Sequence, residues 1–152
     1  MVEQPSTALK MPKYGKRSIH NLSTAHSDLV ILFSEVIKYF DCSIIEGSRS
    51  VERQKELFDK GFSKIDGKTK KSKHNFMPSL AVDVVPYPIN WSDKKRMYYF
   101  AGFVKGIAKL LLKEGKIKHE IRWGGDWDGD TKINDQTFID LPHFELKKIV
   151  NN

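Results

Sequence analysis

The stretch SKHNFMPSLAVDVVPYP (72–88) contains a short hydrophobic strand and two side chains that can bind a metal ion. Ala81–Val85 is rich in valine, and Pro86 ends the predicted strand because proline has no N–H for the sheet. Asp83, in the middle of this strand, either faces solvent or is paired inside the protein, because burying a carboxylate alone is costly. His74 lies nine residues before Asp83. The stretch therefore predicts one strand of a sheet and supplies two candidate metal ligands.

A second segment, DLPHFEL (140–146), places His143 three residues after Asp140 and two before Glu145. On a strand, His143 and Glu145 point to the same face while Phe144 points into the core. Two imidazoles and one carboxylate, from His74, Asp83 and His143, would form a three-ligand site with a fourth position for water, as in catalytic zinc sites. The spacing alone leaves a metal site and ordinary hydrogen-bonded roles both open. Ordinary roles are expected for the remaining histidines, His20, His26 and His119.

Periodicity, caps and turn residues predict the elements around these two segments. They are a helix over 22–40 with Ser23 or Thr24 as N-cap, a strand over 42–46, a helix over 51–60 capped by Ser50, a long helix capped by Ser92, and strands over 117–123 and 142–146. Helices packed on a small, mostly antiparallel sheet give an α+β fold.

The chain has 152 residues, which predicts one domain over 1–152 with an irregular arm at 1–13. The single cysteine, Cys42, excludes an intrachain disulfide framework. No apolar run approaches the ~20 residues of a membrane span. The N-terminus has no apolar signal segment, so a cytoplasmic location is expected.

A net charge of +7 and a pI near 9.4 indicate an anionic partner such as nucleic acid, acidic lipid or a cell-wall polymer. Six lysines against one acid, Asp66, lie between residues 60 and 73, in a segment predicted to be an exposed loop. Nucleic-acid binding is disfavoured because these lysines are not interleaved with stacking aromatic residues.

Three carboxylates alternate with other residues in GGDWDGDTKIND (124–135). Asp126, Asp128 and Asp130 repel one another there, and a hard cation such as Ca²⁺ would relieve that repulsion. The segment is either a calcium-responsive loop or a solvated acidic turn.

Four motifs follow one another along the chain: EGSRSVERQ (46–54), SKH…AVDVVPYP (72–88), RWGGDWDGD (122–130) and DLPHFEL (140–146). Together with YGKRSIHNLSTAHSDLV (14–30), they resemble zinc peptidases of the D-Ala-D-Ala carboxypeptidase and L-alanyl-D-glutamate endopeptidase family, especially its compact phage endolysins. The resemblance implies a zinc site in a surface cleft. One departure is the spacing between His74 and Asp83, where eight residues stand in place of the family's usual six.

The resemblance implies a role for each matching residue. His74, Asp83 and His143 would bind Zn²⁺, and Asp140 would be the general base, with Glu145 as the alternative. Substrate would be held by Arg49, Gln54 and Ser72, and Arg49 could also steady a developing oxyanion. Trp123 and Trp127 would line the cleft or pack in the core.

These assignments predict a zinc endopeptidase that cuts the stem peptide of bacterial peptidoglycan between L-Ala and D-Glu. A D-Ala-D-Ala carboxypeptidase or dipeptidase would use the same groups. We expect a monomer whose lysine-rich loop also holds anionic envelope polymers. It would be made in the host cytoplasm and reach the wall only after release by another factor.

Overall fold

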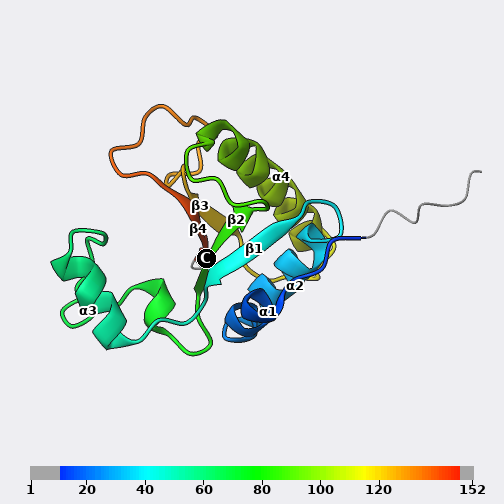
Figure 1. Cartoon of the computed structure of the whole chain (residues 1–152). Helices are drawn as coiled ribbons and strands as arrows, with labels where there is room; N and C mark the ends of the chain where they lie inside the picture. Colours follow the sequence, from blue (N-terminus) through cyan, green and yellow to red (C-terminus); the bar gives the residue numbers. More distant parts are fainter. Residues whose placement is uncertain (1–10, 148–152) are drawn as a thin grey trace, which may run out of the picture.

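The computed structural model describes residues 11–147. These residues form α1 (Lys16–Ser23), α2 (Ser27–Val36), β1 (Cys42–Glu46), α3 (Val51–Asp59), the short 3-10 helix η1 (Lys73–Asn75), β2 (Ala81–Pro86), α4 (Lys94–Lys113), β3 (Ile121–Gly124) and β4 (Asp140–Leu146). In Figure 1, α1, α2 and α4 lie together beside the sheet, whereas α3 stands apart from them. The predicted α+β fold is confirmed.

The sheet has the order β1-β2-β4-β3, and every neighbouring pair of strands is antiparallel. Val82 pairs with Phe144, which pairs in turn with Trp123, and all three side chains are buried. Asp83 and His143 form the next pair along β2 and β4 and therefore point to the opposite face. The sheet thus separates a hydrophobic face from a face that carries the candidate ligands.

The hydrophobic core lies between that apolar face and the helices α2 and α4. Phe33 of α2 and Phe100 of α4 are at most 1% exposed, and both contact the ring of Phe144 edge-on. Burying a side chain of this size stabilises the fold by about 1.5–3 kcal/mol relative to leaving it in water. These contacts fix β4 against the helices and so fix the position of the strand that carries His143.

The helix predicted over 22–40 is two helices, so that prediction was wrong in its start and its N-cap. Residues 24–26 leave the helix to pair with Ser79, whose N–H donates to the Thr24 carbonyl and whose carbonyl accepts from the His26 N–H, each at 2.8 Å. Helix α2 then begins with His26 as N-cap, because its Nδ1 accepts the Asp28 N–H at 3.0 Å.

Three other predicted boundaries also shift. Asp93, not Ser92, caps α4, since its side chain accepts the N–H of Arg96. Strand β3 begins at Ile121 because the preceding N–H groups, at Lys118 and His119, bond to a carboxylate instead of a strand. Strand β4 begins at Asp140, which pairs with Gly124 across a bulge. The expected arm at 1–13 lies mostly outside the described residues, and 11–15 form no helix or strand.

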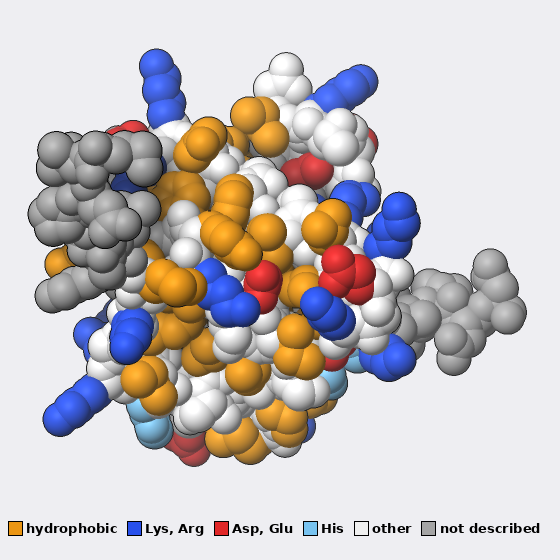
Figure 2. Space-filling model, turned by 90° about the vertical axis from the view of Figure 1, so that its right-hand side faces the viewer, with side chains coloured by type: hydrophobic (Ala, Val, Ile, Leu, Met, Phe, Trp, Pro, Cys, Tyr) orange, Lys and Arg blue, Asp and Glu red, His pale blue; other side chains and the backbone are white. Residues whose placement is uncertain are grey.

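On the face of the molecule seen in Figure 2, basic side chains are spread between hydrophobic ones and do not gather in one patch. Among residues 11–147, no helix combines the length and apolar character that spanning a membrane requires.

Candidate metal centre and cleft

The three candidate ligands converge on one point, although they come from η1, β2 and β4. The His74 Nε2 lies 3.3 Å from Asp83 Oδ1 and 3.3 Å from His143 Nδ1, and His143 Nδ1 lies 3.4 Å from Asp83 Oδ1. Ligand atoms bound tetrahedrally to zinc at ~2.0–2.2 Å are separated by about this distance. The geometry therefore fits a three-ligand metal site.

The Asp83 carboxylate has a buried atom that only a cation or a donor could satisfy. Among the described residues, Asp83 Oδ1 has no hydrogen-bond partner. Burial raises the pKa of Asp83, but the neighbouring His74 and His143 outweigh burial and hold it well below its usual range. Burial lowers the pKa of His143, but the nearby Asp83 carboxylate and the hydrogen bond to Glu145 raise it to about 9. The cluster therefore attracts positive charge, as a metal-binding ligand set does.

In each imidazole, the ring nitrogen that does not face Asp83 has a hydrogen-bond partner of its own, as in most metal-binding histidines. His74 Nδ1 lies 2.8 Å from the Gly47 carbonyl, and His143 Nε2 lies 2.9 Å from Glu145 Oε1. A Cβ on Gly47 would lie 2.2 Å from the Asn21 carbonyl oxygen, so only glycine allows this close approach. The inner nitrogens of the two rings are thereby left to face Asp83.

Asp140 lies at the edge of the cluster, where it can accept a proton. Its Oδ2 is 4.0 Å from His143 Nδ1, and its side chain is 35% exposed. Burial and the nearby Asp83 charge raise the pKa of Asp140, against the opposing charges of His143, His74 and Arg49. A Cβ on Gly124 would come within 2.1 Å of the Asp140 carbonyl oxygen, so glycine is needed where β3 meets the start of β4.

Glu145, the alternative base, is already occupied on both carboxylate oxygens. It accepts from His143 on one oxygen and from Arg122 at 2.8 Å on the other, and Lys73 lies 3.2 Å away. Its side chain is only 6% exposed. Glu145 therefore orients His143, and both of its oxygens already have partners, whereas Asp140 is more exposed.

Arg49 faces the cleft but uses most of its donors within the protein. Its Nε and Nη2 donate to the Glu46 carboxylate at 2.9 and 2.7 Å, and its Nη1 donates to Gln54 Oε1 at 2.8 Å. Nη2 also lies 3.6 Å from Asp83 Oδ2. Arg49 thus holds the second oxygen of a candidate ligand while one edge of its guanidinium borders the cleft.

Gln54 and Ser72 differ in their access to substrate. Gln54 is 0% exposed, and its amide donates to Ser63 Oγ and to the Ile65 carbonyl. It therefore lies beneath the cleft surface and positions Arg49 and the 63–65 loop. Ser72 borders the cleft, and its hydroxyl accepts the His74 N–H at 3.2 Å, which starts η1.

The ligand cluster opens into a cleft of about 860 Å³. One wall is residues 57–72 and the other is the loop between β3 and β4, and both segments extend away from the helical layer (Figure 1). Trp127 lines this cleft, stacks on Phe138 and lies 5.4 Å from the His143 ring, whereas Trp123 is a core residue. The lining also includes residues that the sequence did not predict, among them Glu46, Phe62, Trp91 and Phe138.

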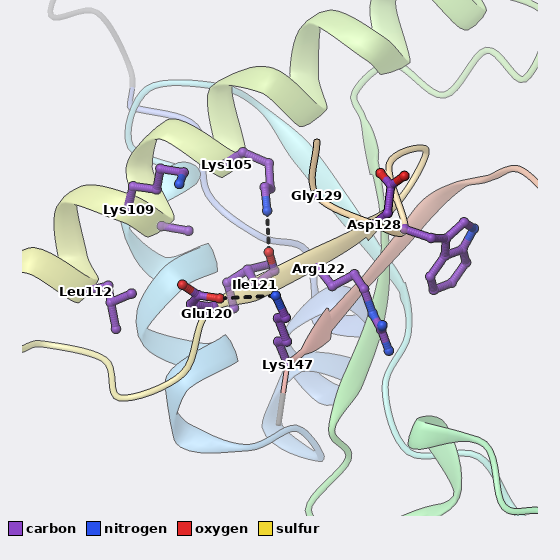
Figure 3. A pocket seen from close by; sticks show the side chains of 11 residues that line it. Lys105, Lys109, Leu112, Glu120, Ile121, Arg122, Asp128, Gly129 and Lys147 are labelled. Carbon is purple, nitrogen blue, oxygen red and sulfur yellow. Dashed lines mark hydrogen bonds and ion pairs between the residues drawn. The ribbon is translucent and has the colours of Figure 1, made fainter. Parts of the chain in front are cut away.

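A smaller pocket of about 220 Å³ lies on another part of the surface, between α4 and β3 (Figure 3). Two of its lysines are engaged within the protein, since Lys105 donates to the Ile121 carbonyl and Lys147 pairs with Glu120 at 3.5 Å, whereas Lys109 has no such partner among the described residues. Arg122 lines this pocket and bonds to Glu145. The pocket therefore touches the outer support of His143 but none of the candidate ligands.

The structure also brings Asp126, Asp128 and Asp130 together, each with one oxygen within 4.8 Å of the others. Asp126 is 8% exposed, and its Oδ1 has no hydrogen-bond partner among the described residues. Its Oδ2 accepts the Thr131 N–H at 3.0 Å. The cluster thus combines one buried, unpartnered oxygen with two exposed carboxylates.

Two of the histidines assigned ordinary roles meet at Asp28. Its Oδ2 accepts the backbone N–H groups of Lys118 and His119 at 2.8 and 3.1 Å, and His119 Nδ1 lies 2.7 Å away. His26 caps the same helix and contacts the His119 ring edge-on. These contacts join the segment before β3 to α2. The three side chains also lie close enough together to hold a metal ion, so the ordinary role of both histidines stays a prediction.

The fold matches that of a solved endopeptidase. The crystal structure of the L-Ala D-Glu endopeptidase ChiX of Serratia marcescens matches with a TM-score of 0.66 and 27% sequence identity, over 93% of this chain and 94% of that chain. A search of curated proteins finds no match.

The sequence profile of phage L-alanyl-D-glutamate peptidases matches residues 11–147. The chain belongs to this family, and it is a peptidoglycan hydrolase. The predicted family is confirmed.

Proposed function

We propose that the protein is a zinc-dependent endolysin that hydrolyses the bond between L-Ala and D-Glu in the stem peptide of bacterial peptidoglycan. The observation that carries this proposal is the convergence of His74 Nε2, Asp83 Oδ1 and His143 Nδ1 at 3.3–3.4 Å in a chain of this family. The buried, unpartnered Asp83 Oδ1 supports a cation at that point.

His74, Asp83 and His143 would hold the metal ion. When bound, zinc would supply a Lewis acid that lowers the pKa of a water molecule to ~7 and polarises the scissile carbonyl. Asp140, at the cleft edge with a raised pKa, accepts the proton of the attacking water and returns it to the leaving amine. Arg49 holds Asp83 and presents its remaining guanidinium edge to the carbonyl oxygen or to a substrate carboxylate.

The test is digestion of purified peptidoglycan followed by mass spectrometry of the new termini. We expect new L-Ala carboxyl ends and D-Glu amino ends, lost after chelation and restored by zinc. Release of free D-Ala without these ends would instead identify a D-Ala-D-Ala carboxypeptidase. Activity that survives complete removal of metal would overturn the zinc assignment.

We also propose that the lysine-rich loop holds anionic envelope polymers and that the enzyme acts as a monomer. Lys68, Lys70 and Lys71 are exposed on this loop. Replacing all three by methionine should weaken wall binding and flatten its salt dependence, since exposed charges are screened within ~10 Å at 0.1 M salt. Unchanged wall binding at low salt would assign the lysines to solubility alone. Release from the host cytoplasm by another factor stays a prediction.

A second cation, Ca²⁺, is proposed for Asp126, Asp128 and Asp130. Support comes from the buried oxygen of Asp126 that lacks a partner and from the two exposed carboxylates beside it. The loop leads into β4, so a bound cation would order the segment that carries Asp140.

A further inference from the structure

Two lysines line the wall of the cleft that faces the candidate metal centre. Lys64 and Lys70 belong to the segment between α3 and η1, and both border the same cavity as His74 and His143. Within residues 11–147, no carboxylate lies within 4.0 Å of either ammonium group. Both charges are therefore free for a ligand in the cleft.

The other charges on the cleft floor are already matched. Arg49 is paired with Glu46 at 2.7 Å and lies 3.6 Å from Asp83, which also contacts both histidines. Besides the free guanidinium edge of Arg49, an anionic substrate therefore finds unpaired partners in the wall, at Lys64 and Lys70.

Lys64 is held across the cleft by an aromatic ring of the opposite wall. Its Nζ lies 5.0 Å from the centre of Phe138, a cation–π distance. Phe138 stacks on Trp127, which lies 5.4 Å from the His143 ring. This row of contacts connects Lys64, through two aromatic rings, to His143 and holds its ammonium group at the cavity.

The backbone of Lys70 is fixed by a closed turn around Asp66. Asp66 accepts the N–H groups of Lys68, Thr69 and Lys70 at 2.9–3.2 Å and the Thr69 hydroxyl at 2.7 Å. The Thr69 hydroxyl bond and these backbone bonds lower the pKa of Asp66 to about 2, so the turn keeps its charge across the physiological range. Lys70 is thus preorganised two residues before Ser72, which reduces the entropy lost on binding.

The substrate of the proposed function carries carboxylates that can pair with Lys64 and Lys70. In the bond between L-Ala and D-Glu, the D-glutamate continues the chain through its γ-carboxyl group and keeps a free α-carboxylate beside the scissile amide. Walls that contain diaminopimelate carry a further carboxylate on the next residue. Either group would lie within the cleft when the scissile amide is at the ligand cluster.

We propose that Lys64 and Lys70 form a carboxylate-binding subsite that selects stem peptides with a free carboxylate on the leaving side of the scissile bond. The inference rests on the proposed peptidase function. It adds that the enzyme prefers cell walls whose stem peptides carry this free carboxylate. Ammonium groups bind a carboxylate as point charges, and an amide at the same position forfeits this attraction.

The experiment measures kcat/KM for the zinc-loaded full chain on synthetic stem peptides. One pair differs at the second residue, D-isoglutamate or D-isoglutamine, and another differs at the third, diaminopimelate or L-lysine. The wild-type protein should prefer the free carboxylate by about 10- to 100-fold, the range for a hydrogen bond to a charged group. The pair that shows the preference identifies which carboxylate is bound.

The variants Lys64→Met and Lys70→Met should lose most of this preference, because their rate on the charged peptide falls toward their rate on the uncharged one. Lys60→Met, an exposed lysine of the same segment outside the cleft, is the matched control and should retain the preference. Equal rates of the wild-type protein on both members of each pair would overturn the subsite and leave the peptidase function standing. An equal loss on charged and uncharged peptides would also overturn it. No cleavage of any peptide would remove the proposed function itself.

Discussion

Asp83 of β2 and His143 of β4 are paired residues of one antiparallel ladder, with Asp83 Oδ1 3.4 Å from His143 Nδ1. Directly opposed residues on neighbouring strands point to the same face of a sheet, so two of the three candidate ligands are placed by strand register alone. The neighbouring pair, Val82 and Phe144, anchors the same register in the core. A shift of either strand by one residue would move the ligand on that strand into the hydrophobic face.

The first prediction concerns the metal itself. His143→Ala should abolish stoichiometric zinc binding, because it removes one of three ligands and leaves Asp83 without its strand partner. Metal analysis of the purified variant is the measurement, and His20→Ala, at an exposed histidine, is the control. Full zinc occupancy in His143→Ala would disprove the ligand set. Chelation of the wild-type protein should abolish activity but retain most of the fold, because a core of this size does not depend on metal.

The second prediction separates the base from the ligands. Asp140→Asn should retain zinc and lower kcat by roughly 10²- to 10⁴-fold, the range for loss of a general base. Asp135→Asn removes another carboxylate of the cleft and should change kcat by only a few-fold. Steady-state kinetics combined with metal analysis measures both effects. Near wild-type turnover in Asp140→Asn would transfer the role to another group.

The third prediction concerns Glu145, which orients His143. Glu145→Gln should weaken zinc affinity by roughly 10- to 100-fold, as loss of such an outer partner typically does. The matched variant is Glu120→Gln, an exposed glutamate that pairs with Lys147, and it should leave the affinity unchanged. Competition with a chelator of known affinity provides the comparison. Equal zinc affinity in the two variants would assign Glu145 to the Arg122 ion pair alone.

The side of the sheet on which His143 lies could be predicted from the sequence because alternation along a strand is a short-range regularity, whereas spacing alone left its role as a metal ligand open. Alternation along β4 puts His143 and Glu145 on one face with Phe144 on the other, and the structure has this arrangement. The sequence did not predict where such a regular pattern is interrupted. The pairing of Ser79 with residues 24–26 interrupts a continuous apolar periodicity, and only tertiary contact reveals it.

The walls of the cleft were the least predictable part. Gln54 matches a substrate-holding position of the family, yet the structure buries it as a support for Arg49. The contact between Lys64 and Phe138 joins two loops. Neither loop has a periodic sequence pattern, so the sequence does not predict this contact. Residues whose role depends on how two loops meet therefore need the structure.

The fourth prediction is a pH-dependent contribution of Asp28 to stability. Burial raises its pKa, but hydrogen bonds from His119 and from the backbone N–H groups of Lys118 and His119 outweigh burial and lower it. A lowered folded-state pKa stabilises the fold above the unfolded pKa of ~3.9 and loses this effect as the pH falls through the folded value. Asp28→Asn should therefore reduce the free energy of unfolding by about 1–3 kcal/mol at pH 7 and by less near pH 3.

Urea unfolding at the two pH values measures this difference. Asp59→Asn, which removes an exposed ion pair with Lys55, is the control and should cost less than about 1 kcal/mol at either pH. An equal loss for Asp28→Asn at pH 7 and pH 3 would show that its carboxylate charge does not contribute.

The last prediction tests calcium at the loop before β4. The pKa of Asp130 is raised: the Lys132 N–H lowers it, but desolvation and the charges of Asp135 and Asp128 outweigh that bond. A cation would relieve this crowding and satisfy the orphaned oxygen of Asp126. Calorimetry on the zinc-loaded protein should give weak binding, with a Kd near the 10⁻⁴–10⁻³ M of extracellular calcium modules.

The matched variant replaces Asp126, Asp128 and Asp130 by asparagine. Asparagine keeps one side-chain oxygen, so the turn bonds to the N–H groups of Thr131 and Lys132 can persist while the charge is lost. Calcium should release no heat with this variant, and it should stimulate hydrolysis only in the wild-type protein, because ordering the loop steadies the segment that carries Asp140. Identical calorimetric traces for the two proteins, with no effect of calcium on hydrolysis, would identify the segment as a solvated acidic turn.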